Sequence, residues 1–143
     1  LWSYDVRYFR DQGAKFAFLT ALMPALVSLS PDEIDFLYSV PGVFTPEGTR
    51  ALNLEYELKS DPAQTLKSLP ALVGGIAKCR LRPQSVSRMA RMAATAGALR
   101  KMYEAYPEHP AYFGAWADKA RPLWKKADAE RHAYFERVLR EYA

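Results

Sequence analysis

The spacing of apolar residues along this chain is helical rather than strand-like. Alternating runs of β-branched residues are absent, and Val and Ile are scarce beside Ala and Leu. The C-terminal segment has the clearest pattern, because five apolar side chains fall near one face of a helix: Trp124, Phe135, Val138, Leu139 and Tyr142. The hydrophobic pattern therefore predicts an all-α protein.

Capping residues and prolines mark where the predicted helices begin. Ser30, Pro31 and Glu33 form a complete start signal, with a cap, a proline in the first turn and a reciprocal capping-box residue. The cap and proline recur at Thr45-Pro46 and at Asp61-Pro62. Each interval between these signals fits one short helix and a turn.

These signals, with two later ones at residues 82–83 and 109–110, predict seven helices. The expected ranges are 4–11, 14–27, 31–39, 46–59, 62–78, 84–105 and 110–142. Pro70 and Pro122 should kink or divide the helices that contain them. Because no linker is long enough to mark a second domain, we expect one helical domain over residues 1–143. It should be built as an array of antiparallel helical hairpins, either α-solenoid-like or an irregular bundle.

Two apolar segments could be taken for a membrane span and a phosphate-binding loop, but the sequence supports neither interpretation. Residues 16–29 form the most apolar run, but a bilayer span needs roughly 20 residues, so the run predicts a buried helix. Gly74 and Gly75 lack the GK[ST] ending of a phosphate-binding loop, so we expect them to permit close helix packing.

The composition is that of a folded domain rich in aromatic residues. Half of the 143 residues are apolar, and nine Tyr, seven Phe and three Trp are present. Such side chains fill either a core or an interface, and the sequence leaves both open. The single cysteine, Cys79, excludes an internal disulfide and a cysteine-cluster metal site.

Charge is distributed unevenly along the chain. Residues 62–103 contain eight basic and no acidic residues, whereas residues 1–61 have a net charge of −4 and residues 104–143 are neutral. Seven of these basic residues are candidates for partner binding: Lys78, Arg80, Arg82, Arg88, Arg91, Arg100 and Lys101. We call them the basic set. Arg88 and Arg91 should project from one helix face, with Met89, Ala93, Ala96 and Tyr103 turned toward the core.

The basic set has three interpretations. It is a solvated surface, a contact for an acidic protein surface, or a site for nucleic acid or anionic lipid, since arginine suits carboxylates and phosphates alike. Nucleic acid is the less favoured partner because the pI is moderate and the acidic N-terminal third would repel phosphate.

No residue pattern indicates catalysis, a cofactor or a metal ion. His109 and His132 are the only histidines, and neither belongs to a recognisable triad or zinc motif. The acidic residues Asp32, Glu33 and Asp35 suit a helix N-terminus, and Glu55 and Glu57 point apart on a helix. Cys79, flanked by cations, is the only candidate nucleophile.

The basic and hydrophobic turn at residues 78–83, which ends in proline between two predicted helices, resembles the junction between pentatricopeptide repeats. Helical pairs of about 31 residues, as over residues 30–61, are typical of an α-solenoid-like stack. The resemblance covers residues 45–105. The RNA-reading positions of that family have no match in this sequence, so base recognition is not implied.

The general character of the chain is similar to that of helical accessory subunits of mitochondrial complexes, including the pentatricopeptide-like subunit on the catalytic head of euglenozoan ATP synthases. This resemblance implies a structural subunit in a hetero-oligomeric complex. The chain begins at Leu1 without Met, as expected of a mature mitochondrial protein whose targeting segment has been removed, or of a trimmed chain.

Three functional hypotheses follow from the sequence. The leading one is a non-catalytic subunit that docks on the acidic surface of a larger assembly through the basic set, without cofactor or metal. The second is a helical-repeat RNA-binding protein that uses the same residues. The third is a small helical enzyme with Cys79 as nucleophile.

Overall fold

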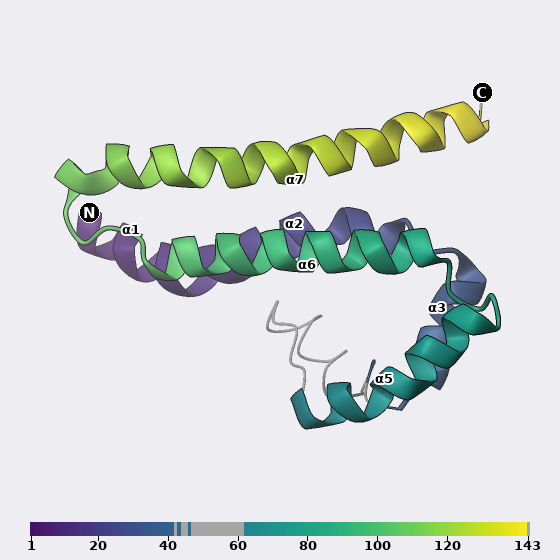
Figure 1. The fold of residues 1–143 in the computed structure, drawn as a ribbon. Helices are drawn as coiled ribbons and strands as arrows, with labels where there is room; N and C mark the ends of the chain where they lie inside the picture. Colours follow the sequence, from purple (N-terminus) through teal and green to yellow (C-terminus); the bar gives the residue numbers. More distant parts are fainter. Residues whose placement is uncertain (42, 44–45, 47–61, 143) are drawn as a thin grey trace. The chain divides into compact units, whose positions relative to one another are not determined.

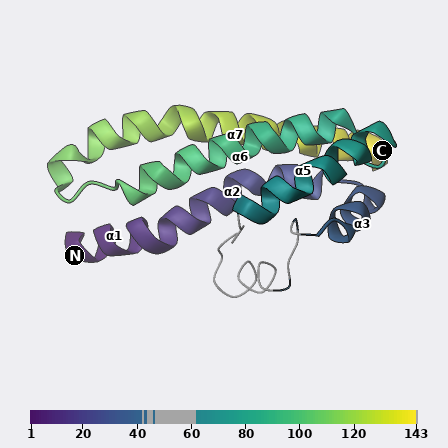
Figure 2. The same cartoon turned by 60° about the horizontal axis from the view of Figure 1, so that its bottom comes forward.

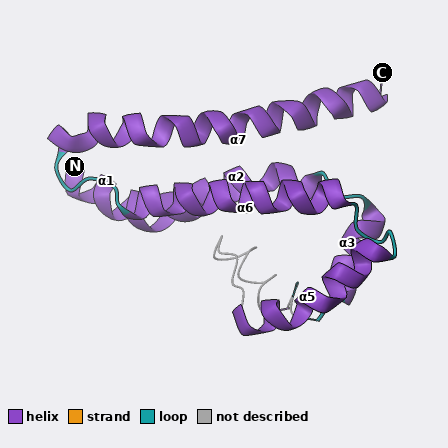
Figure 3. Ribbon diagram, viewed as in Figure 1, coloured by secondary structure: helices purple, strands orange, loops and turns teal. Residues whose placement is uncertain are grey.

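The computed structural model describes residues 1–41, 43, 46 and 62–142 (Figure 1). Within these residues the secondary structure consists of helices, with no strand (Figure 3). The all-α prediction is therefore confirmed. Their arrangement as a solenoid-like array of hairpins stays a prediction.

The helix bounds agree closely with the sequence signals from Pro31 onward, whereas the helices predicted over 4–11 and 14–27 form one continuous helical stretch, Trp2–Val27. In chain order the elements are α1 (Trp2–Tyr8), a π-helical turn η1 (Phe9–Gly13), α2 (Ala14–Val27), α3 (Pro31–Ser39), α5 (Pro62–Ala77), α6 (Pro83–Glu104), a 3₁₀ turn η2 (Pro110–Tyr112) and α7 (Phe113–Tyr142). The predicted helix over 46–59 lies outside the described residues, except for Pro46. Pro70 and Pro122 do not divide their helices, because α5 and α7 continue through them.

The chain folds as two compact units, and each is described by itself. The terminal unit comprises residues 1–27 and 89–143, and the middle unit comprises residues 28–88. Helix α6 contributes its first turns to the middle unit and the rest to the terminal unit. The expected single domain over 1–143 stays a prediction.

In the terminal unit, small side chains allow α2, α6 and α7 to pack closely. The axes of these helices run in roughly the same direction in both views, and α2 contacts α7 (Figures 1 and 2). Buried alanines come from all three helices: Ala14, Ala17, Ala21, Ala25, Ala96, Ala120 and Ala127. Met92, Ala96 and Leu99 form the buried stripe of α6. Ala93 is exposed, contrary to prediction, because it lies about 100° around the helix from Met92.

Aromatic side chains fill one end of the terminal unit. Tyr106, which is 4% exposed, stacks on Trp2 and Phe9 and meets Trp116 edge-on, with ring centroids 5.6, 4.7 and 4.9 Å away. The indole N–H of Trp116 donates to the Met102 carbonyl oxygen at 2.7 Å. Tyr106 is therefore a core residue, which settles for it the question that the sequence left open, whereas Trp2, Phe9 and Trp116 are partly exposed.

The middle unit is organised around the start of α3 and its packing on α5. The predicted capping box is confirmed: the Ser30 hydroxyl accepts from the Glu33 backbone N–H at 3.3 Å, and the Glu33 carboxylate accepts from the Ser30 N–H at 2.9 Å. Gly75 is buried, and a Cβ there would overlap the ring of Phe36. Gly75 thus has the packing role predicted for it, whereas a Cβ added at Gly74 would meet no atom within 4 Å.

We expect Gly75→Ala to lower the free energy of unfolding by about 1–2 kcal/mol, because the added methyl group must displace Phe36. Gly74→Ala is the matched control on the same helix. It should raise the free energy of unfolding by up to about 1 kcal/mol, since alanine favours the helix and the space is open. Urea unfolding followed by circular dichroism measures both, and effects of the same sign would contradict the close α3–α5 packing.

None of the helices within the described residues is, taken alone, long and apolar enough to cross a membrane; the Trp2–Val27 and Pro31–Ser39 segments meet that criterion only when combined across a break.

Candidate interaction surfaces

Helix α2 is apolar on its exposed side as well as on its buried side. Between Phe16 and Pro31 the sequence contains no charged residue. A helix that is apolar all round is normally buried all round. Here Phe16, Met23 and Val27 are 41%, 44% and 46% exposed, and their spacing places them along one stripe. Within the described residues, this segment is thus buried on one side, as predicted, and exposed on the other.

Two hollows follow this stripe of α2. The first, of about 340 Å³, is lined on α2 by Thr20, Met23, Pro24 and Val27, and on α7 by Arg131, Tyr134 and Phe135. The second, of about 290 Å³, is lined by Tyr8, Phe9, Gly13, Phe16, Ala17, Thr20, Tyr103 and Trp124. Because both include Thr20, they meet end to end. We call this surface the α2–α7 groove.

The electrostatics of the groove are simple. Within the part of the chain that the structure describes, Arg131 is the only charged residue that lines either hollow. Its Nη2 atom donates to Asp128 Oδ1 at 2.7 Å, one turn earlier on α7. Farther along α7, Phe135 and Leu139 are 54% and 69% exposed and extend the apolar surface. The groove is therefore apolar, with one cation in the hollow that Met23 and Val27 also line.

The structure divides the basic set between the two units. Lys78, Arg80, Arg82 and Arg88 belong to the middle unit, and Arg91, Arg100 and Lys101 to the terminal unit. Arg88 and Arg91 share helix α6, as predicted. Lys78 and Lys101 are exposed.

Several members of the basic set make contacts within the fold. Arg91 Nη2 lies 3.4 Å from Glu130 Oε1 on α7. Arg100 Nε donates to Glu104 Oε1 at 2.9 Å, one turn along α6. The Arg80 guanidinium lies over the Phe36 ring, 5.5 Å from its centroid. These contacts give Arg80, Arg91 and Arg100 structural roles that need no partner.

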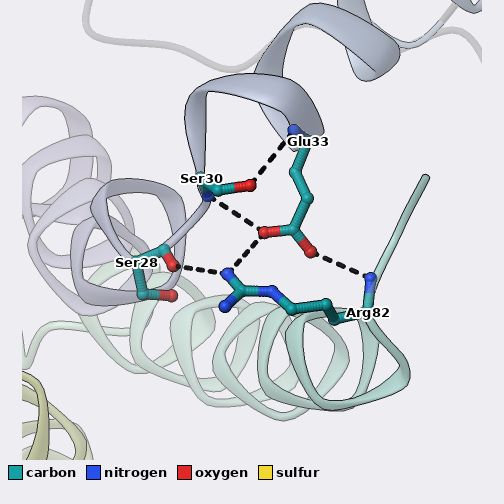
Figure 4. A network of polar contacts seen from close by, with 4 residues as sticks. All are labelled: Ser28, Ser30, Glu33 and Arg82. Carbon is teal, nitrogen blue, oxygen red and sulfur yellow. Dashed lines mark hydrogen bonds and ion pairs between the residues drawn. The ribbon is translucent and has the colours of Figure 1, made fainter. Parts of the chain in front are cut away.

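Arg82 makes the most extensive of these contacts (Figure 4). Its Nη2 atom donates to Glu33 Oε2 at 2.6 Å and to the Ser28 carbonyl oxygen at 3.5 Å. Its backbone N–H donates to Glu33 Oε1 at 2.9 Å. Glu33 is 2% exposed, so its carboxylate lies in the interior and ties α3 to the turn before α6. The sequence identified Glu33 as a capping residue but contained no local signal for a partner 49 positions away.

The partners of Glu33 determine its ionisation. Burial alone would raise the pKa of Glu33. Hydrogen bonds from the Arg82 guanidinium, from the backbone N–H groups of Ser30 and Arg82, and from the Ser85 side chain outweigh burial and lower the pKa from 4.5 to about 2. Glu33 is therefore a buried structural anion and not a proton donor near neutral pH.

Cys79 occupies the turn that ends α5. Its φ of 55° places it in the left-handed region, where glycine is the usual residue. The Arg80 N–H donates to the Gly75 carbonyl oxygen at 2.8 Å, and the Cys79 N–H to that of Ile76 at 3.1 Å, the pattern of a Schellman motif. Its thiol is exposed and borders a polar hollow of about 330 Å³ lined also by Ser30, Asp32, Glu33, Asp35, Arg80 and Arg82.

The remaining candidates for chemistry are dispersed. His109 Nδ1 accepts from the Ala111 N–H at 3.3 Å and so caps η2, as its position suggested. His132 lies on the exposed side of α7. Within the part of the chain that the structure describes, no three His, Cys, Asp or Glu side chains gather as metal ligands would. Glu55 and Glu57 lie outside the described residues.

Comparisons with protein-family models, with curated proteins and with solved structures find no match for this chain.

Proposed function

We propose that this protein is a non-catalytic subunit that binds a larger protein through the α2–α7 groove. The observation that carries the proposal is the exposure of Phe16, Met23 and Val27 on a helix that has no charged residue after Lys15. Leaving apolar surface in water costs about 25 cal/mol per Å². The exposed apolar stripe on this helix is therefore explained by a partner that covers it.

The size of the surface fits a protein interface. The exposed parts of Tyr8, Phe16, Met23, Val27 and Phe135 amount to on the order of 400 Å². A standard interface buries about 800 Å² on each partner, with an apolar centre and a polar rim. The groove supplies such a centre.

The proposed class of function is the one expected from the sequence, a non-catalytic subunit. Its principal contact is now the α2–α7 groove instead of the basic set. Binding through the basic set stays a prediction, as does RNA binding by the same residues. The intramolecular contacts of Arg82 and Arg91 give these two members of the basic set structural roles within the fold. Attachment to a mitochondrial complex such as ATP synthase rests on the sequence resemblance alone.

We expect the double variant Met23→Glu/Val27→Glu to lose its partner in native co-purification. Two carboxylates in an apolar contact would each be desolvated without a counter-charge. Val73→Glu is a matched control, because Val73 is 63% exposed on α5 and lines neither hollow. Circular dichroism confirms that each variant is folded.

Mass spectrometry of nuclease-treated eluates measures the outcome. A stoichiometric partner should remain with the wild type and with Val73→Glu and be absent from the double variant. Equal recovery with all three proteins would remove the groove from the interface. Recovery of RNA, with all proteins lost after nuclease, would favour the RNA-binding hypothesis instead.

A further inference from the structure

We infer that the occupant of the α2–α7 groove is an amphipathic α-helix of a partner protein, about five turns long, with an acidic side chain opposite Arg131. This inference rests on the proposed function and specifies the chemistry of the partner. Three properties of the groove support it: its length, its cross-section and its charge.

The length of the groove matches a helix of moderate size. On the α1–α2 side the lining residues extend from Tyr8 to Val27. At a rise of 1.5 Å per residue, these positions span about 28 Å, or about five helical turns. The opposite wall on α7 extends from Trp124 to Phe135. An occupant that filled both hollows would therefore have to be elongated and follow α2.

The cross-section of the groove also favours a helix. The lining combines small residues, Gly13, Ala17 and Thr20, with large ones such as Phe16, Met23 and Phe135. The small residues leave room for side chains of an occupant between the large ones. A surface between two packed helices accepts the side-chain ridge of a third helix at 8–10 Å between axes. A second copy of this chain would present the same hollow, and two hollows placed face to face leave voids that packed interfaces avoid.

The charge of the groove restricts the occupant further. Among the described residues, Arg131 is the only charged one in the lining, and its hydrogen bond to Asp128 occupies one of the five N–H donors of a guanidinium. The remaining donors can bind a carboxylate on the partner. Because no acidic residue among those described lines either hollow, and Asp128 beside Arg131 is already paired with it, a basic side chain on the partner would find no counter-charge in this lining.

The test is selection of peptides on the full-length protein. The probe is a phage-displayed library of random 20-residue peptides without cysteine or proline. We expect enriched peptides to have apolar residues at i, i+3, i+4 and i+7 throughout and a Glu or Asp near one end. Thr20→Arg, at the junction of the hollows, should weaken their binding at least tenfold. Ala94→Arg, at an exposed alanine of α6 outside the lining, should not.

Two further comparisons test length and charge. Peptides cut to half their length should bind at least tenfold more weakly, because they reach one hollow only. Exchanging the acidic residue of a peptide for Lys should weaken binding to the wild type but have much less effect on Arg131→Ala.

Several results would overturn the inference. They are enriched peptides without helical periodicity, binding that Thr20→Arg leaves unchanged, a concentration-dependent dimer that Thr20→Arg dissociates, or sedimentation with phosphatidylglycerol vesicles that Thr20→Arg abolishes. The first two results, obtained while the Met23→Glu/Val27→Glu variant still loses its protein partner, would refute the helical occupant alone. Absence of any stoichiometric partner in co-purification would refute the proposed function itself.

Discussion

Replacing Arg82 by alanine is expected to lower the free energy of unfolding by about 2 kcal/mol. The substitution removes the guanidinium partner of the Glu33 carboxylate, which is 2% exposed in the intact fold. Removing one member of a fully buried ion pair costs about 3–5 kcal/mol. The cost is smaller here because the Arg82 side chain is 53% exposed and because the backbone N–H groups of Ser30 and Arg82 still donate to Glu33.

Arg80→Ala is the matched control for this prediction. Arg80 lies in the same turn, but its main contact is the face of the Phe36 ring, so its removal should cost no more than about 1 kcal/mol. Denaturant unfolding at neutral pH measures both variants. Equal effects of Arg80→Ala and Arg82→Ala would show that the contacts of Glu33 contribute nothing specific.

The same network makes the free energy of unfolding depend on pH in the acid range. Because its folded pKa of about 2 lies below its ordinary value of 4.5, Glu33 stabilises the fold above about pH 4.5 and loses this contribution as the pH falls toward 2. Each pKa unit corresponds to about 1.4 kcal/mol, so the full contribution is about 3 kcal/mol. Glu33→Gln should therefore flatten the acid side of the stability profile between these pH values. An unchanged slope would show that other carboxylates determine it.

Replacing Tyr106 by alanine is expected to lower the free energy of unfolding by about 4 kcal/mol. Its ring is buried among Trp2, Phe9, Phe113 and Trp116, and truncating a buried aromatic leaves a cavity that rigid neighbours cannot fill. Tyr112→Ala, at a tyrosine that is 68% exposed, should cost less than about 1 kcal/mol. The near-ultraviolet circular dichroism signal should fall for Tyr106→Ala only. A loss at Tyr106 no larger than that at Tyr112 would contradict an aromatic core.

The sequence predicted the features of the fold that depend on neighbouring residues. Ser30, Pro31 and Glu33 identify the start of α3 because a cap, a proline and a reciprocal carboxylate act within one turn. The close approach at Gly75 could also be anticipated, since glycine in a helix has a cost that packing must offset.

Features that depend on residues distant in sequence could not be predicted in this way. Nothing near Arg82 indicates that its partner is Glu33, and nothing near Tyr106 distinguishes a core ring from an interface ring. The sequence contains a partial signal for the α2–α7 groove. The absence of charge between Phe16 and Pro31 indicated burial, but only the packing of α2 on α7 reveals which side is left for a partner.

The most direct test of the proposed function is hydroxyl-radical footprinting of the free protein and of its native assembly. In the free protein, Met23 and Phe135 should be oxidised readily because both are about half exposed. In the assembly both should be protected, whereas Tyr38, 57% exposed on α3 of the middle unit, should react equally in the two samples. Equal oxidation of Met23 and Phe135 in both samples would contradict binding through the α2–α7 groove.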